Sequence, residues 1–133
     1  MIYYIKLYFI SLVAFFAVDM IWLGLVARTF YKKHLGYIMA PDVNWIAALI
    51  FYLLFIVGIL VFVVLPGLKE NSLSSTILRA LLFGLITYAT YDLTNLATIR
   101  DWPLTVTLVD LIWGMTLTTL VSLAGFFGGK WLG

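Results

Sequence analysis

The sequence has 133 residues, of which 65% are hydrophobic and only 11% carry a charge. A soluble domain averages about 25% charged residues, so this chain cannot cover a water-facing surface and we expect it to lie in a bilayer. Its net charge of +2 provides no basic surface for nucleic acid. The absence of cysteine and the single histidine exclude disulfides, thiolate nucleophiles and His-rich metal sites, and no motif indicates a cofactor.

Four segments are long and apolar enough to cross a bilayer, which needs about 20 such residues per helix. They run from about residue 3 to 27, 45 to 65, 74 to 99 and 103 to 127. The first begins like a secretory signal, but its apolar run has the length of a span, and we expect it to be retained. The sequence predicts an all-α, polytopic membrane protein: one domain, residues 1–133, forming a four-transmembrane-helix bundle.

The first connection, residues 28–44, is rich in aromatic and basic side chains and is expected to lie in the membrane interface. Trp45, Trp102 and Trp131 stand near the ends of spans, where tryptophan commonly anchors helices at the interface. The basic residues divide evenly between the two faces. The positive-inside rule therefore does not choose an orientation, and dual topology is an open alternative.

Proline, glycine and serine mark the other helix ends. Pro66 and Gly67 are expected to stop the second span. The polar stretch LKENSLSS, residues 68–75, offers caps for the third span, and Pro103 suits the first turn of the fourth. Only residues 100–102 separate the last two spans, which predicts a tight antiparallel hairpin.

Three aspartates lie inside apolar spans. Asp19 is eight residues before Ala27, which places it roughly 12 Å from the face of the first and third connections. Asp92 is nine residues before Asp101 and Asp110 is nine residues after it, so both lie about 10–13 Å from the same face. The sequence therefore predicts three carboxylates from three helices at one depth. The second span carries no acidic or basic residue and is expected to serve as scaffold.

Polar and small residues share helix faces with these acids. On the third span, Tyr88, Asp92 and Asn95 follow a helical spacing, with Tyr91 at the border. On the fourth, small or polar residues recur every four positions, a spacing that lets helices approach closely. Polar faces are expensive in lipid, so we expect these faces to meet inside the bundle. The small and polar positions of the fourth span are Asp110, Gly114, Thr118 and Ser122.

Similar pentapeptides surround two of the acids, VDMIW at residues 18–22 and VDLIW at residues 109–113. Because the two helices run in opposite directions, we expect Trp22 to lie nearer the interface and Trp113 to lie deeper, in a pocket wall. Three glycines are expected to mark helix contacts rather than a ligand. They are Gly24, Gly84 and Gly114.

Three carboxylates close together cannot all stay ionised without a counter-charge. Protons are shared, an arginine pairs with them, or a metal ion or organic cation binds. Arg100 lies on the same side and has the length to reach inward, and aromatic rings offer faces to a cation. The predicted binding pocket consists of Asp19, Asp92, Asp110, Asn95, Tyr88, Tyr91, Trp113 and Arg100.

The stretches VDMIWLG, YDLTNLATIRDWP and VDLIWG resemble a family of small bacterial integral membrane proteins of unknown function. The resemblance covers nearly the whole chain but brings no activity with it. The resemblance implies a location in a bacterial inner membrane. Because relatives often sit beside genes for fatty-acid modification, it also implies a connection with lipid, and no more than that. The matching motif positions are Asp19, Trp22, Asp92, Asn95, Arg100, Asp101, Trp102, Pro103, Asp110 and Trp113.

Three hypotheses of function remain open. In the first, the acids bind or transport a proton, a metal ion or an organic cation, and the chain forms a homo-oligomer to enclose a pathway. In the second, the protein is an enzyme or accessory protein that acts on membrane lipid, with one aspartate as acid or base. In the third, the acids form a satisfied polar core in a structural assembly protein.

Overall fold

All 133 residues are described by the computed structural model, which consists of helices joined by short connections. Four of the helices are long and apolar enough to span a membrane, as predicted. The first span joins α1 (Ile2–Trp22), the π-helical η1 (Leu23–Ala27) and α2 (Arg28–Leu35). The second joins α3 (Trp45–Ile59), the π-helical η2 (Leu60–Val64) and α4 (Leu65–Glu70), and the third and fourth are α5 (Leu73–Thr98) and α6 (Leu104–Leu132).

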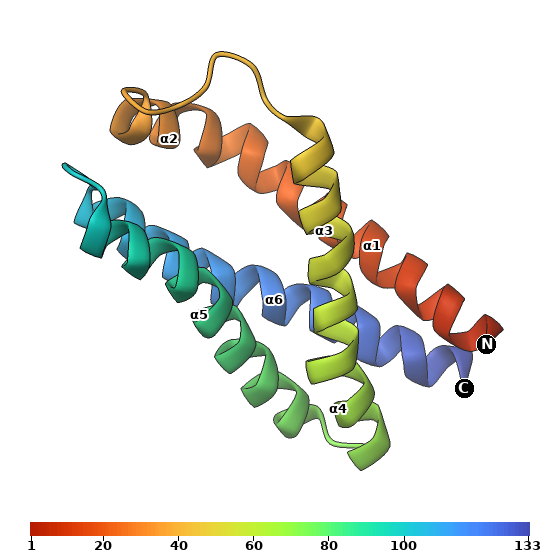
Figure 1. The fold of residues 1–133 in the computed structure, drawn as a ribbon. Helices are drawn as coiled ribbons and strands as arrows, with labels where there is room; N and C mark the ends of the chain where they lie inside the picture. Colours follow the sequence, from red (N-terminus) through yellow and green to blue (C-terminus); the bar gives the residue numbers. More distant parts are fainter.

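Helix α6 runs through the middle of the bundle, with α5 packed along one side and α1 along the other (Figure 1). Both chain termini lie at one end of the molecule, and α2 and the turn between α5 and α6 lie at the opposite end. The second span crosses this layer obliquely. Its later part, η2 and α4, packs against α5, whereas α3 approaches α5 only near its own C-terminal end, where Phe55 stacks on Phe83 at 5.6 Å. The bundle is therefore closed at the end with the termini and splayed between α3 and α5.

The first span continues for eight residues beyond the predicted end at Ala27. The π-helical turn passes directly into α2, and the inward positions Ala27, Tyr31 and Leu35 keep a spacing of four residues. Leu35 is buried against Trp102 and Val106, so tertiary packing holds this extra length of helix. Only residues 36–44 remain as a connection, and half of the predicted interfacial segment is instead a helix.

Pro66 does not end the second helix, and that prediction is wrong. In a regular α-helix, a proline ring clashes with the carbonyl group four residues earlier. Here the preceding turn is widened, and the N–H of Leu65 donates to the carbonyl of Leu60 five residues back. The helix ends instead at Asn71, whose left-handed backbone, with φ of 47°, allows Ser72 N–H to reach the carbonyl of Gly67 at 3.1 Å.

The hairpin of α5 and α6 forms as predicted. Ser72 caps α5 by accepting from Ser75 N–H at 3.1 Å, and Pro103 stands immediately before α6. The two helices meet at Gly84 and Gly114, where a Cβ on Gly84 would lie 2.4 Å from the carbonyl oxygen of Gly114. A Cβ on Gly24 would meet no neighbouring atom within 4 Å, so the predicted helix contact at Gly24 is wrong.

Candidate functional site

The centre of the candidate site is a contact between two acids on neighbouring helices. Asp92 of α5 is fully buried, and Asp110 of α6 is 6% exposed. The two side chains are neighbours across the contact between α5 and α6, and no hydrogen bond joins their carboxyl groups. Two ionised carboxylates repel each other in a buried site, so the pair is more stable when it holds one proton. No N–H or O–H group of the protein donates to either oxygen of Asp92.

Helix α2 reaches this pair through Tyr31, whose hydroxyl donates a hydrogen bond to Oδ1 of Asp110. Below the pair, the Trp102 indole donates to Oγ1 of Thr107 at 3.1 Å. Trp102 is only 6% exposed, so the prediction that it anchors the chain at the membrane interface is wrong. Its ring instead closes the space between α2 and the α5–α6 turn.

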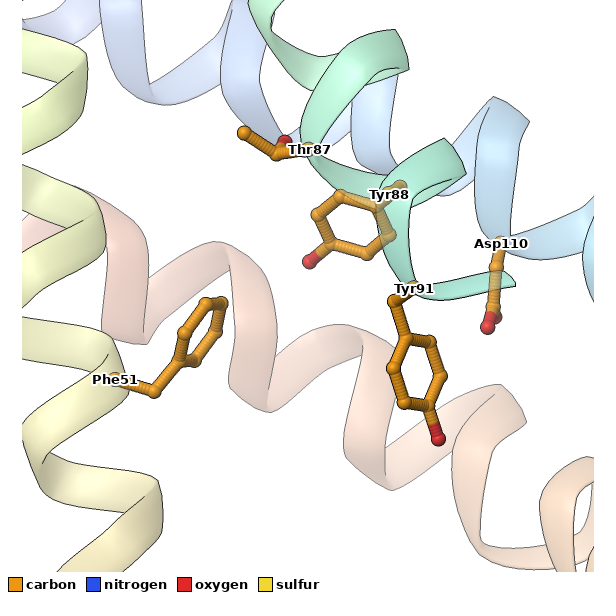
Figure 2. Close-up of a pocket in the computed structure, with 5 residues that line it drawn as sticks. All are labelled: Phe51, Thr87, Tyr88, Tyr91 and Asp110. Atoms are coloured by element: carbon orange, nitrogen blue, oxygen red, sulfur yellow. The ribbon is translucent and has the colours of Figure 1, made fainter. Parts of the chain in front are cut away.

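Asp110 lines a cavity of about 360 Å³ together with side chains from α3 and α5 (Figure 2). Tyr88 extends from α5 toward Phe51 of α3, and Tyr91 stands on the next turn of α5. Phe51 and Tyr91 are 47% and 56% exposed, so the rim of this cavity opens to the outside between α3 and α5. In a span, that outside is lipid.

Asp19 lies in a second cavity, of about 280 Å³, which shares the walls Phe51 and Tyr88 with the first. The rings of Trp22 and Trp113 stack here at 4.3 Å with an interplanar angle of 9°. The two tryptophans therefore lie at one depth. The prediction that Trp22 is interfacial while Trp113 is deeper is wrong.

This stacking also sets the relative depth of the acids. Each tryptophan follows its aspartate by three residues, and α1 and α6 run antiparallel. Asp19 and Asp110 are consequently displaced by about 9 Å along the helix axes. The sequence-based count began at Ala27, although the helix extends to Leu35, and therefore placed Asp19 too near the face of the first connection. The three acids form a pair and a separate single carboxylate.

The remaining predicted residues are distributed around these cavities. Trp113 lines the cavity of Asp19, whereas Asn95 lies one turn after Tyr91 on α5 and lines neither cavity. Arg100 is exposed in the α5–α6 turn and pairs with no acid. The only salt bridge of the protein joins Arg79 to Glu70 at 2.8 Å, near the end that holds the termini.

The geometry can be set beside known proteins. A family model of predicted membrane proteins, DUF2177, matches residues 4–127. The chain belongs to this family. Its description assigns no function to its members. No curated protein and no solved structure gives a significant match to the chain.

Members of the site that the sequence did not predict come mainly from α2 and α3. The sequence did not predict Tyr31 as a site residue, because the first helix was expected to end at Ala27. Its spacing of four residues from Ala27 is the signal that points to it. Phe51 lines both cavities and Tyr52 lines that of Asp19, so the second span is more than scaffold. Nothing in its uniformly apolar sequence distinguishes the face that bears them.

The arrangement limits the chemistry of the site. No three acidic or histidine side chains come close enough to hold a metal ion together, because Asp19 is displaced from the pair. No basic side chain neutralises the pair or Asp19. The two adjoining cavities form a groove with aromatic walls, with the neighbouring acids Asp92 and Asp110 at one end and the single acid Asp19 at the other.

Proposed function

We propose that this membrane protein binds an organic cation in the groove, and that the Asp92–Asp110 pair releases its shared proton when the cation enters. The observation that carries the proposal is the burial of these two neighbouring acids beside an aromatic cavity, with no basic side chain paired with either of them. The acceptor oxygens of Asp92, which have no donor within the protein, are the groups that such a proton serves.

The argument for a cation follows from charge. A pair that shares one proton carries a single negative charge in a site of low dielectric, where an unpaired charge costs several kcal/mol. A cation in the groove offsets that cost and repels the proton, so binding and proton release are linked. The aromatic walls add cation–π attraction, which strengthens where water is excluded.

The argument for entry from the membrane follows from the exposed rim. Phe51 and Tyr91 border the opening between α3 and α5, so a ligand with an apolar body reaches Asp110 without crossing a polar surface. A chain of this size needs a second copy to enclose a continuous pathway. We therefore also propose that the protein transports the cation, that it forms a homo-oligomer and that it lies in a bacterial inner membrane.

The test measures proton release on binding. Tetraphenylphosphonium is added to the detergent-solubilised full chain in weak buffer with a pH indicator. We expect about one proton released for each cation bound. Asp92→Asn and Asp110→Asn should abolish most of this release, because an amide cannot share an acidic proton. Asp42→Asn is the matched control, since Asp42 is exposed in the connection before α3.

Two results would contradict the proposal. One is cation binding without any proton release by the unaltered chain. The other is release that persists in both pair variants while their helical content stays normal by circular dichroism.

A second candidate function is modification of a membrane lipid, with Asp110 as the acid or base. The opening toward lipid favours it, because an acyl chain can enter between α3 and α5. Deleting the gene should then change the lipid profile of the cell, and complementation with Asp110→Asn should not restore it. An unchanged lipid profile after deletion would count against this candidate. A satisfied structural core fits less well, because both carboxylate oxygens of Asp92 lack donors.

A further inference from the structure

We propose that the cavity around Asp19 recognises a fully alkylated ammonium group, the trimethylammonium head of choline-type molecules. This inference rests on the proposed function and names the class of cation that the groove selects. The cavity combines one carboxylate with an almost complete aromatic wall, and both features are arguments for this ligand class.

The first argument concerns the carboxylate. Asp19 is 9% exposed, pairs with no basic side chain and accepts no hydrogen bond from the protein. It lines the cavity together with the rings of Trp22, Tyr52 and Tyr88. A negative charge left without donors in an apolar wall is complementary to a cation that brings no donors of its own.

The second argument concerns the wall. The stacked rings of Trp22 and Trp113 provide a broad surface, and Phe15 and Tyr52 lie 5.4 Å apart, centroid to centroid, beside it. Tryptophan is the strongest aromatic partner for a cation, and cages of this kind bind quaternary ammonium groups. Nine of the ten lining residues are hydrophobic, so few acceptors exist for N–H groups.

This shortage of acceptors separates alkylated from simple ammonium ions. A primary ammonium has three N–H donors, and each one left unsatisfied in a desolvated site costs free energy. Only the Asp19 carboxylate and the hydroxyls of Tyr31, Tyr52 and Tyr88 can accept in this cavity, and the rest of its wall is apolar. A trimethylammonium group has no such requirement and places its charge on methyl groups that contact ring faces.

The link to the pair is direct, because the two cavities share Phe51 and Tyr88. A positive charge held at Asp19 lies in the cavity that adjoins that of Asp110, with Tyr88 in the wall of both, and disfavours the proton there. The alkyl body of the ligand then extends toward the opening between α3 and α5. The same chemistry fits a free cation such as choline and the head group of a lipid.

The experiment compares ligands on the unaltered chain by quenching of tryptophan fluorescence. The series is choline, tetramethylammonium, ethanolamine and 3,3-dimethylbutanol, the uncharged isostere of choline. We expect choline and tetramethylammonium to bind at least about tenfold more tightly than the other two. Equal affinity for ethanolamine, or for the uncharged isostere, would overturn the inference. This comparison needs no variant and does not depend on any variant folding.

Variants then test whether choline binds in the cavity around Asp19. Asp19→Asn and Trp113→Leu should each weaken choline binding by about tenfold or more. Trp131→Leu is the matched control, because Trp131 is 82% exposed at the far end of α6, and it should bind choline normally. Unchanged binding in both cavity variants would also overturn the inference.

Two further comparisons complete the test. One distinguishes a lipid head group from a free cation, and the other distinguishes failure of the inference about Asp19 from failure of the proposed function. Competition by phosphatidylcholine but not phosphatidylethanolamine in nanodiscs indicates a lipid head group, and choline binding without such competition indicates a free cation. If the ammonium series shows no preference but tetraphenylphosphonium still releases a proton from the Asp92–Asp110 pair, only the inference about Asp19 fails. If proton release also fails, the proposed function fails with it.

Discussion

The two ends of the bundle use the same helices in different ways. Toward the termini, the second span fills the space between α1, α5 and α6 with a continuous apolar core that includes Leu7, Ile59 and Val121. Gly67 approaches Thr76 there so closely that a Cβ would lie 1.9 Å from its hydroxyl oxygen. Toward α2 and the α5–α6 turn, α3 diverges from α5, and the space between them holds two cavities and three acids.

The end with the termini stabilises the fold, whereas the end with the cavities lowers its stability. Close helix contacts through small residues stabilise the closed end by dispersion, which is the main attraction between helices in lipid. At the open end, buried carboxyl groups without donors cost free energy. Such a cost is typical of binding sites, where the ligand later satisfies the groups. Three substitutions test this division between the two ends.

The largest effect is expected where α5 and α6 touch, at the boundary between the two ends. Gly84→Ala places a Cβ 2.4 Å from the backbone carbonyl of Gly114, so the helices must separate. We expect a loss of about 1–3 kcal/mol, measured by unfolding in mixed micelles with increasing dodecyl sulfate. Gly24→Ala is the matched control, because it meets no neighbour and should retain full stability. Equal stability of the two variants would show that the contact is looser than described.

The second substitution should raise the stability of the protein instead of lowering it. Asp92→Leu replaces two buried oxygens that lack donors with an apolar group. We expect the protein to become more stable by about 1–3 kcal/mol in the same unfolding assay, while proton release on cation binding is lost. A large loss of stability would mean that Asp92 holds the helices together, and would favour the structural hypothesis over the binding site.

The smallest effect concerns the link from α2 to the acid pair. Tyr31→Phe removes the hydrogen bond to Asp110 but keeps the ring. We expect a local loss of about 0.5–1.5 kcal/mol, seen as faster hydrogen exchange in Arg28–Leu35 with little change in the rest of the first span. Tyr37→Phe removes a bond to the carbonyl of Asp101 in the exposed connection and serves as the control. If both variants exchange alike, Tyr31 does not hold α2 in place.

Much of the fold followed from composition alone, because a bilayer leaves few structures possible. Runs of about 20 apolar residues predict spans, and the three residues between the last two spans predict the hairpin. Two errors came from local rules that context overrode. Pro66 did not stop its helix because a π-helical turn made room for the ring. The first helix did not end at Ala27, because Leu35 is buried against Trp102 and holds the additional turns in place.

The sequence by itself determined that this is a four-span helical protein with acids inside its membrane segments and that Asp92 and Asp110 lie level, since both are counted from one short turn. Only the tertiary structure decided where Asp19 stands, because its depth depends on how α1 slides along α6, and the stacking of Trp22 on Trp113 fixes that position. The groove likewise depends on the splay of α3 from α5. Periodicity specifies the faces of a helix, but only packing between helices specifies their axial offset and crossing angle.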